Sequence, residues 1–128
     1  MKDQELTDRY ARFAKGMEIL LEHPEIEVGT TPSEVIHWDG GMRLLHFAPV
    51  KKVLNPVPVL IVWALVNRYY ILDLQPDRSV IRKLLEAGLD VYAIDWGYPS
   101  QVDRYLTIDD YVNDLMDNAV DILRKRSG

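Results

Sequence analysis

The polar residues best placed for chemistry follow the two apolar runs of the chain. Asn67 and Arg68 come directly after the first run, Asp73 closes the same loop, and Asp95 ends the second run. In open α/β sheets, ligands bind beyond the carboxyl ends of the strands. We therefore expect a site in the loop 66–73. The two aspartates could take part in catalysis, although a capping or turn role is the favoured interpretation for both.

Most familiar catalytic arrangements are missing from the sequence. It contains no cysteine, and none of its four serines stands in a Gly-x-Ser-x-Gly elbow. No glycine-rich phosphate loop follows either apolar run. The histidines are His23, His37 and His46, and none has a second ligand at metal-binding spacing. We expect no metal and no cofactor, and the residues alone leave the site undefined.

Length and composition limit the class of protein. A chain of 128 residues is at most one domain, and its 20 acidic and 15 basic residues give a net charge of −5. This balance argues against broad nucleic-acid binding. The first residues are charged and no apolar stretch follows them, so no signal peptide is expected. The cytoplasm is the expected location.

The apolar run 57–66 dominates the pattern of the expected core. Pro58 and the shortness of the run argue against a membrane span, which needs about 20 residues. The run does not alternate with polar residues, which predicts a strand buried on both faces, as in a parallel sheet. A second strand is expected at 89–94, after a helix at 77–87 that Asp77 caps. Strand, helix and strand in succession predict a parallel pair and an α/β fold.

A β-hairpin and a long helix flank this unit. The Asp-Gly-Gly turn between two apolar stretches predicts antiparallel strands at 34–38 and 42–47. Towards the end of the chain, apolar residues at helical spacing predict a helix at 107–126. Thr107 and Asp110 are expected to form a capping pair at its start.

An amphipathic helix is expected at 4–22, where apolar residues recur at spacings of three and four. His23 and Pro24 should end it. The helix either packs on its own domain or docks on a partner, and the pattern leaves both interpretations open.

Four separated motifs resemble the polyhydroxyalkanoate synthases, and the resemblance covers residues 10–128. The short N-terminal extension looks like that of the two-subunit (class III/IV) kinds, whose catalytic chain works with a smaller partner protein. The motifs are Ala64-Leu65-Val66-Asn67-Arg68, Asp77-Arg78-Ser79, Asp90-Val91-Tyr92-Ala93-Ile94-Asp95-Trp96-Gly97-Tyr98-Pro99 and Leu106-Thr107-Ile108-Asp109-Asp110-Tyr111.

The resemblance implies an α/β-hydrolase fold. This chain would be an incomplete N-terminal part of it, with a helical extension over 1–29 and a core part over 30–128. The implied reaction transfers acyl groups from a hydroxyacyl-coenzyme A thioester to a growing polyester. The cysteine nucleophile, the histidine and the aspartate of the family lie beyond the helix that ends at Gly128. We therefore expect a chain that is inactive alone, located in the cytoplasm or at the surface of polyester granules.

The same resemblance assigns a role to the loop after the first apolar strand. In this fold a backbone N–H of that loop helps to form the oxyanion hole, and by position the donor is Val66 or Asn67. Arg68, Asp73 and Asp95 are expected near the site. Two rival interpretations remain: a non-catalytic piece that binds the synthase or its partner subunit through the N-terminal helix, and a fragment of another α/β-hydrolase such as an esterase.

The fold implied by the resemblance also has a consequence for stability. The strand at 57–65 would lie between the strand at 89–94 and the strand that carries the nucleophile, which this sequence does not contain. A free edge of this kind is a template for pairing with another strand. We expect the 128-residue chain to be marginally stable, and to self-associate through this edge or to require a partner.

Overall fold

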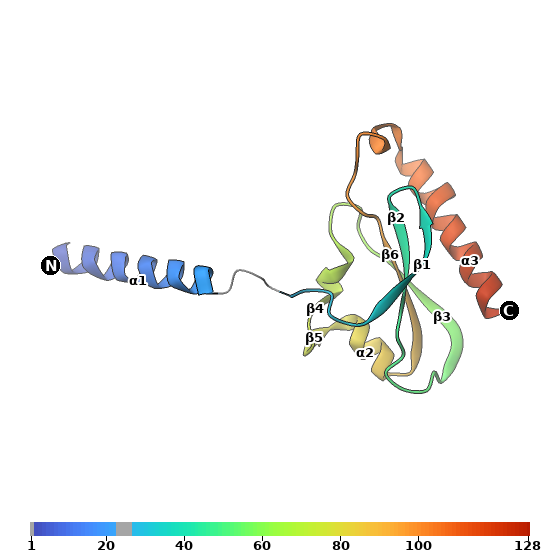
Figure 1. The fold of residues 1–128 in the computed structure, drawn as a ribbon, viewed down its shortest axis with the longest axis horizontal. Helices are drawn as coiled ribbons and strands as arrows, with labels where there is room; N and C mark the ends of the chain where they lie inside the picture. Colours follow the sequence, from blue (N-terminus) through green and yellow to red (C-terminus); the bar gives the residue numbers. More distant parts are fainter. Residues whose placement is uncertain (1, 23–26) are drawn as a thin grey trace.

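A mixed four-stranded sheet forms the centre of the structure (Figure 1). The computed structural model describes residues 2–22 and 27–128. The helices are α1 (Lys2–Glu22), α2 (Val80–Glu86) and α3 (Asp117–Ser127), and a π-helical segment, Asp110–Met116, leads into α3. Short 3₁₀ turns lie at Tyr69–Leu72 and Asp103–Tyr105. The strands are β1 (Ser33–Asp39), β2 (Met42–Phe47), β3 (Asn55–Val62), β4 (Asp73–Gln75), β5 (Arg78–Ser79) and β6 (Leu89–Asp95).

The order of strands in the main sheet is β1-β2-β6-β3. β1 and β2 form an antiparallel hairpin, and β2 also pairs antiparallel with β6. β3 pairs with β6 in parallel. The expected hairpin and the expected parallel pair are therefore confirmed, and the chain is a mixed α/β structure.

The first apolar strand differs from its prediction. β3 ends at Val62, and the apolar residues that follow it lie in a loop. Val57 is 64% exposed and Val62 is 44% exposed, whereas the last five residues of β6 are buried. The prediction of burial on both faces is wrong for this structure, because β3 has a hydrogen-bonded neighbour on one side only among the described residues. In the part of the chain that is described, β3 is the last strand of the sheet, the edge position expected for it.

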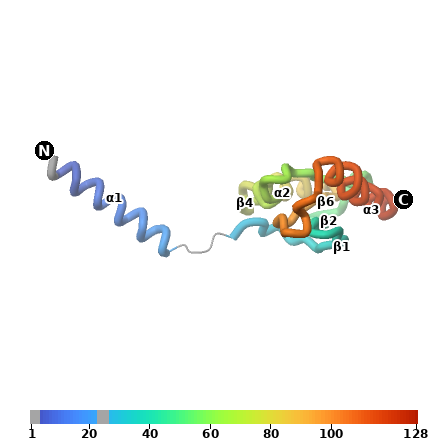
Figure 2. Tube along the Cα trace, turned by 90° about the horizontal axis from the view of Figure 1, so that it is seen from above, coloured from blue at the N-terminus to red at the C-terminus, as the bar shows by residue number. Residues whose placement is uncertain are grey.

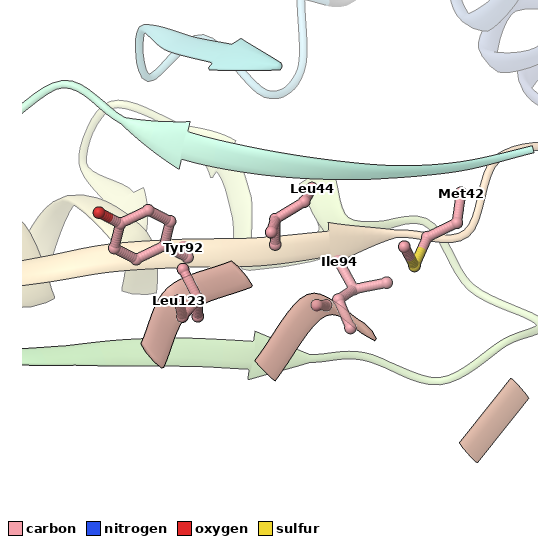
Figure 3. Packing of buried hydrophobic residues seen from close by; sticks show 6 residues of the cluster. Met42, Leu44, Tyr92, Ile94 and Leu123 are labelled. Atoms are coloured by element: carbon pink, nitrogen blue, oxygen red, sulfur yellow. The ribbon is translucent and has the colours of Figure 1, made fainter. Parts of the chain in front are cut away.

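Two apolar clusters hold helices on opposite faces of the sheet. Successive side chains of a strand point to opposite faces, so β2 and β6 each contribute to both clusters. Figure 3 shows the cluster under α3, which consists of Met42, Leu44, Tyr92, Ile94, Ala119 and Leu123. The cluster under α2 consists of Leu45, Phe47, Ile81, Leu85, Val91 and Ala93.

The start of α2 also differs from its prediction. Ser79 caps this helix, because its Oγ accepts a 2.9 Å hydrogen bond from the N–H of Arg82. Asp77, the predicted cap, lies in the turn of the small antiparallel ribbon formed by β4 and β5. The ribbon strands have three and two residues, too few for an alternating pattern to reveal them.

The predicted capping pair of the last helix is confirmed. The Thr107 N–H and hydroxyl both donate to Oδ2 of Asp110, at 2.6 and 2.7 Å, and the Asp110 N–H donates back to the Thr107 hydroxyl at 3.3 Å. This exchange satisfies donors that the first turn of a helix leaves free.

α1 lies apart from the sheet and its two covering helices (Figures 1 and 2). Every residue from 4 to 22 is exposed, including the large apolar side chains Leu6, Tyr10, Phe13, Met17, Ile19, Leu20 and Leu21. Packing on its own domain, one of the two expectations for this helix, is therefore wrong in this structure. The helix end predicted at His23 and Pro24 lies outside the described residues. No helix among those described is long and apolar enough to cross a membrane.

Candidate functional site

The candidate site lies where the parallel strands β3 and β6 end. Val62 and Ile94 are paired in register, so the two loops that follow begin at the same level. The indole N–H of Trp96, in the second loop, donates a 2.8 Å hydrogen bond to the backbone carbonyl of Trp63, in the first. The two loops predicted to share a site are therefore joined directly.

Asp95 is the buried anion of this edge. Its side chain is 1% exposed and forms ion pairs with Arg43, on β2, and with Arg68. Nη2 of Arg68 lies 3.2 and 3.3 Å from the two carboxylate oxygens. The Gly97 N–H donates to Oδ1 at 3.1 Å. With both oxygens engaged by protein donors, the observed role of Asp95 is to join β2 to the two loops.

Arg68 is held between a carboxylate and an aromatic ring. The centre of its guanidinium lies 4.1 Å from the centroid of the Tyr98 ring, a cation–π contact. Its Nε and Nη1 atoms are buried and find no hydrogen-bond acceptor among the described residues. Donors left unsatisfied in this way cost free energy, about 1–3 kcal/mol each. The Asp95 carboxylate and the Tyr98 ring therefore account for the position of this side chain.

The loop that carries Val66 and Asn67 is short and faces solvent. The N–H of Asn67 donates to the carbonyl of Ala64 at 3.2 Å and closes a turn. Val66 is 94% exposed. Within residues 2–22 and 27–128, its N–H donates to no other group, so it is free to bind an oxygen.

Asp73 has a different partner from the other site candidates. Its carboxylate is buried and accepts hydrogen bonds from the N–H and the hydroxyl of Thr31, at 2.8 and 2.7 Å. Its carbonyl accepts a 2.8 Å bond from the Gly29 N–H. Asp73 thus ties the segment before β1 to the loop. Nearby, burial and then the Asp95 charge raise the pKa of Tyr69 above its ordinary value, so its hydroxyl stays protonated at neutral pH.

His46 has a structural role in the sheet. Nε2 of His46 lies 2.8 Å from a carboxylate oxygen of Asp90, and its ring stacks on Tyr92 with a centroid distance of 4.3 Å. His37 lies on β1, and His23 is outside the described residues. In the part of the chain that is described, no three acidic, histidine or cysteine residues are grouped to hold a metal.

Sequence reasoning missed Arg43 and Thr31, the partners of the two buried aspartates. Arg43 lies opposite Asp95 in the antiparallel pairing of β2 with β6, and that register is not readable from a hairpin pattern. Thr31 lies 42 residues before Asp73. The only hint in the sequence was the acidic residue at the end of each apolar or loop segment, since a buried carboxylate needs donors.

The chain matches a known family over part of its length. The model described as poly-beta-hydroxybutyrate polymerase (PhaC) N-terminus covers residues 24–84. Over 124 residues, 97% of its length, the chain is 52% identical to the poly(3-hydroxyalkanoate) polymerase subunit PhaC of Haloferax mediterranei. The chain belongs to the PhaC polymerase family.

Other PhaC polymerase subunits are similar over almost the whole chain. The Synechocystis sp. protein is 48% identical over 96% of the chain, and the Allochromatium vinosum protein is 45% identical over 98%. The chain spans 25% of the Haloferax relative, 33% of the Synechocystis relative and 36% of the Allochromatium relative. The esterase interpretation is set aside by this membership.

Proposed function

We propose that this chain supplies the first part of the catalytic domain of a PhaC polymerase, which transfers hydroxyacyl groups from coenzyme A thioesters to a growing polyester. Family membership supports the proposal, as does the share of each relative that the chain spans. The nucleophile and its histidine and aspartate partners lie outside this chain, so it has no turnover of its own. It acts in the cytoplasm or at the surface of polyester granules.

The sheet supports an α/β-hydrolase fold for the complete domain. An antiparallel hairpin leads to β3 and β6, a parallel pair joined through α2, and the next helix packs on the other face. β3 has one unpaired edge among the described residues. A groove of about 300 Å³ runs between β3 and α3, lined by residues that include Val57, Leu60 and Leu123. In this fold the strand that bears the nucleophile would pair with the free edge of β3.

The oxyanion donor we propose is the N–H of Val66, on the loop after β3. We choose Val66 because its N–H has no acceptor among the described residues, whereas the N–H of the alternative donor, Asn67, already donates to the carbonyl of Ala64. Arg68 and Asp95 hold the loop, and Asp73 anchors its far end to Thr31. An oxyanion donor stabilises the negative charge that develops on the carbonyl oxygen during acyl transfer.

Two substitutions at position 66, made in a full-length polymerase that contains this segment, test the assignment. Val66→Pro removes the N–H and should lower kcat by roughly 10²–10³-fold, whereas Val66→Gly keeps the N–H and should retain most activity. Asn67→Ala should also stay active, since only its side chain changes. Equal activity of the proline and glycine variants, each folded by circular dichroism, would exclude Val66 as the donor. The isolated chain should release no coenzyme A above the blank.

A second proposed function is docking through α1, favoured by the exposure of its apolar side chains. Leu6, Tyr10, Phe13, Met17 and Leu20 recur at spacings of 4, 3, 4 and 3, the pattern of a helix that packs against another helix. We propose that the smaller subunit of the polymerase binds here. Phe13→Glu should abolish co-purification with that subunit, while Lys15→Glu, off the apolar stripe, should not. Unchanged co-purification of the Phe13 variant would place the contact elsewhere.

A further inference from the structure

The loop of Val66 is tied to its neighbour at both ends. At the first end, the carbonyl of Trp63 accepts the indole hydrogen bond of Trp96. At the second end, Arg68 forms its ion pair with Asp95. The three exposed residues among those in between are Ala64, Val66 and Asn67. A loop fixed at two points by groups of another loop is held in place even though its own tip makes few contacts.

The second tie rests on a rigid support. Asp95 is immobilised by Arg43 and by the Gly97 N–H, as well as by Arg68. Tyr98, three residues after Asp95, stacks its ring on the guanidinium. Arginine suits this position, because its planar group can meet a carboxylate and stack on a ring together, whereas a lysine ammonium is a point charge on a flexible stem.

The support survives the loss of Arg68. Asp95 keeps Arg43 and the Gly97 N–H as partners, so removing Arg68 leaves no isolated buried charge. The two buried nitrogen atoms of Arg68 that lack acceptors, Nε and Nη1, disappear with it. The fold therefore depends weakly on Arg68, whereas one of the two fixed ends of the Val66 loop is the ion pair that Arg68 forms.

We propose that Arg68 is a positioning residue for acyl transfer: by bridging Asp95 and Tyr98 it holds the Val66 N–H in the orientation that an oxyanion requires. This inference rests on the proposed function of the Val66 loop. Preorganised donors are effective because they need no reorientation when charge develops in the transition state. Loss of Arg68 should therefore affect kcat more than substrate binding.

The test measures coenzyme A release by a full-length polymerase that contains this segment. Arg68→Gln should lower kcat by about 10–100-fold and change KM less than twofold, with Arg68→Lys recovering only part of the loss. Trp96→Phe, which removes the other tie, should show the same split. Arg104→Gln is the matched control, because Arg104 stacks on Tyr105 in the next loop and forms no ion pair with Asp95.

A double variant separates this inference from the proposed function. If Arg68 acts through Val66, adding Arg68→Gln to Val66→Pro should cause little further loss of kcat, since non-additivity marks residues that act together. If the double variant lost kcat by the product of the two single losses, the inference about Arg68 would be overturned and Val66 would remain the donor. A loss in Arg68→Gln that appears in KM or in the unfolding temperature alone would also overturn the inference. Full activity of Val66→Pro would instead overturn the proposed oxyanion donor.

Discussion

Gly97 lies against the backbone of Gly41, so closely that a side chain at position 97 would overlap with the Gly41 carbonyl oxygen. Gly97 also has a φ angle of +72°, in the left-handed region that residues with a Cβ rarely adopt. This contact brings the turn after β6 onto the turn of the β1–β2 hairpin. The position of the next residue, Tyr98, whose ring stacks on Arg68, depends on this contact.

Gly97→Ala should be strongly destabilising. The left-handed conformation alone costs about 1–2 kcal/mol for a residue with a Cβ, and the overlap with a backbone atom adds to this cost. We expect the free energy of unfolding in urea to fall by more than about 2 kcal/mol. Gly40→Ala is the matched control, since Gly40 has a φ of +56° and open space around it. Similar losses in the two variants would show that the close approach to Gly41 contributes nothing.

The bond between Asp73 and Thr31 provides a test of a buried carboxylate. Asp73→Ala would leave the N–H and the hydroxyl of Thr31 without their acceptor, at a cost of about 2–4 kcal/mol in unfolding free energy. Asp73→Asn keeps one acceptor oxygen and should lose less. Asp77 lies in the β4–β5 turn, two residues before the cap Ser79, so Asp77→Ala should change the free energy of unfolding by less than about 0.5 kcal/mol. A larger effect at Asp77 than at Asp73 would contradict this assignment of roles.

The capping pair at the last helix should make stability depend on pH. Hydrogen bonds from the Thr107 N–H and hydroxyl lower the pKa of Asp110 from its ordinary value of 3.8. Because the folded pKa is depressed, the stabilisation is present above the unfolded pKa and is lost as the pH falls through the folded value. Asp110→Asn should therefore be less stable than the wild type at pH 7, and the difference should shrink below about pH 4. Urea unfolding at pH 7 and pH 3 measures both differences.

Asp114→Asn serves as the control for that experiment. Asp114 lies in the same helical segment and is exposed, but its carboxylate forms no hydrogen bond among the described residues. Its substitution should change stability equally at both pH values. A difference at Asp110 that persists unchanged at pH 3 would mean that the amide replaces the carboxylate as a cap.

Local patterns in the sequence predicted most of the fold. The hairpin and the capping pair of Thr107 and Asp110 depend on residues close together in the chain, whereas the parallel pair follows from the succession of strand, helix and strand. All three are confirmed. The cap of α2 was wrong because two candidates, Asp77 and Ser79, precede the same apolar face. The choice between them depends on the β4–β5 ribbon, which has no sequence pattern of its own.

The candidate site could be located from the sequence but not built from it. Its place followed from the rule that sites lie at the carboxyl ends of parallel strands. Its contacts join residues 27 to 52 positions apart, such as Arg68 with Asp95 and Arg43 with Asp95. Which donor meets a buried aspartate depends on the register between strands, and single residues do not reveal that register. Val66 and Asn67 stayed equal candidates for a different reason: the sequence does not show which N–H of this loop is used by the turn that ends at Asn67.

The unpaired edge of β3 should make the isolated chain self-associate. β3 is hydrogen-bonded only to β6 among the described residues, and its exposed edge carries apolar side chains such as Val57. An edge of this kind can pair with the same strand of a second copy, and a charged side chain on it opposes such pairing. We expect Val57→Lys to shift the chain towards the monomer in sedimentation runs over a concentration series, and Val102→Lys, on an exposed loop, to have no such effect. The wild-type chain should also show an unfolding temperature that rises with concentration, because association stabilises the folded state by mass action. A wild-type monomer at high concentration, with a sharp unfolding transition that does not depend on concentration, would show that this edge does not drive association.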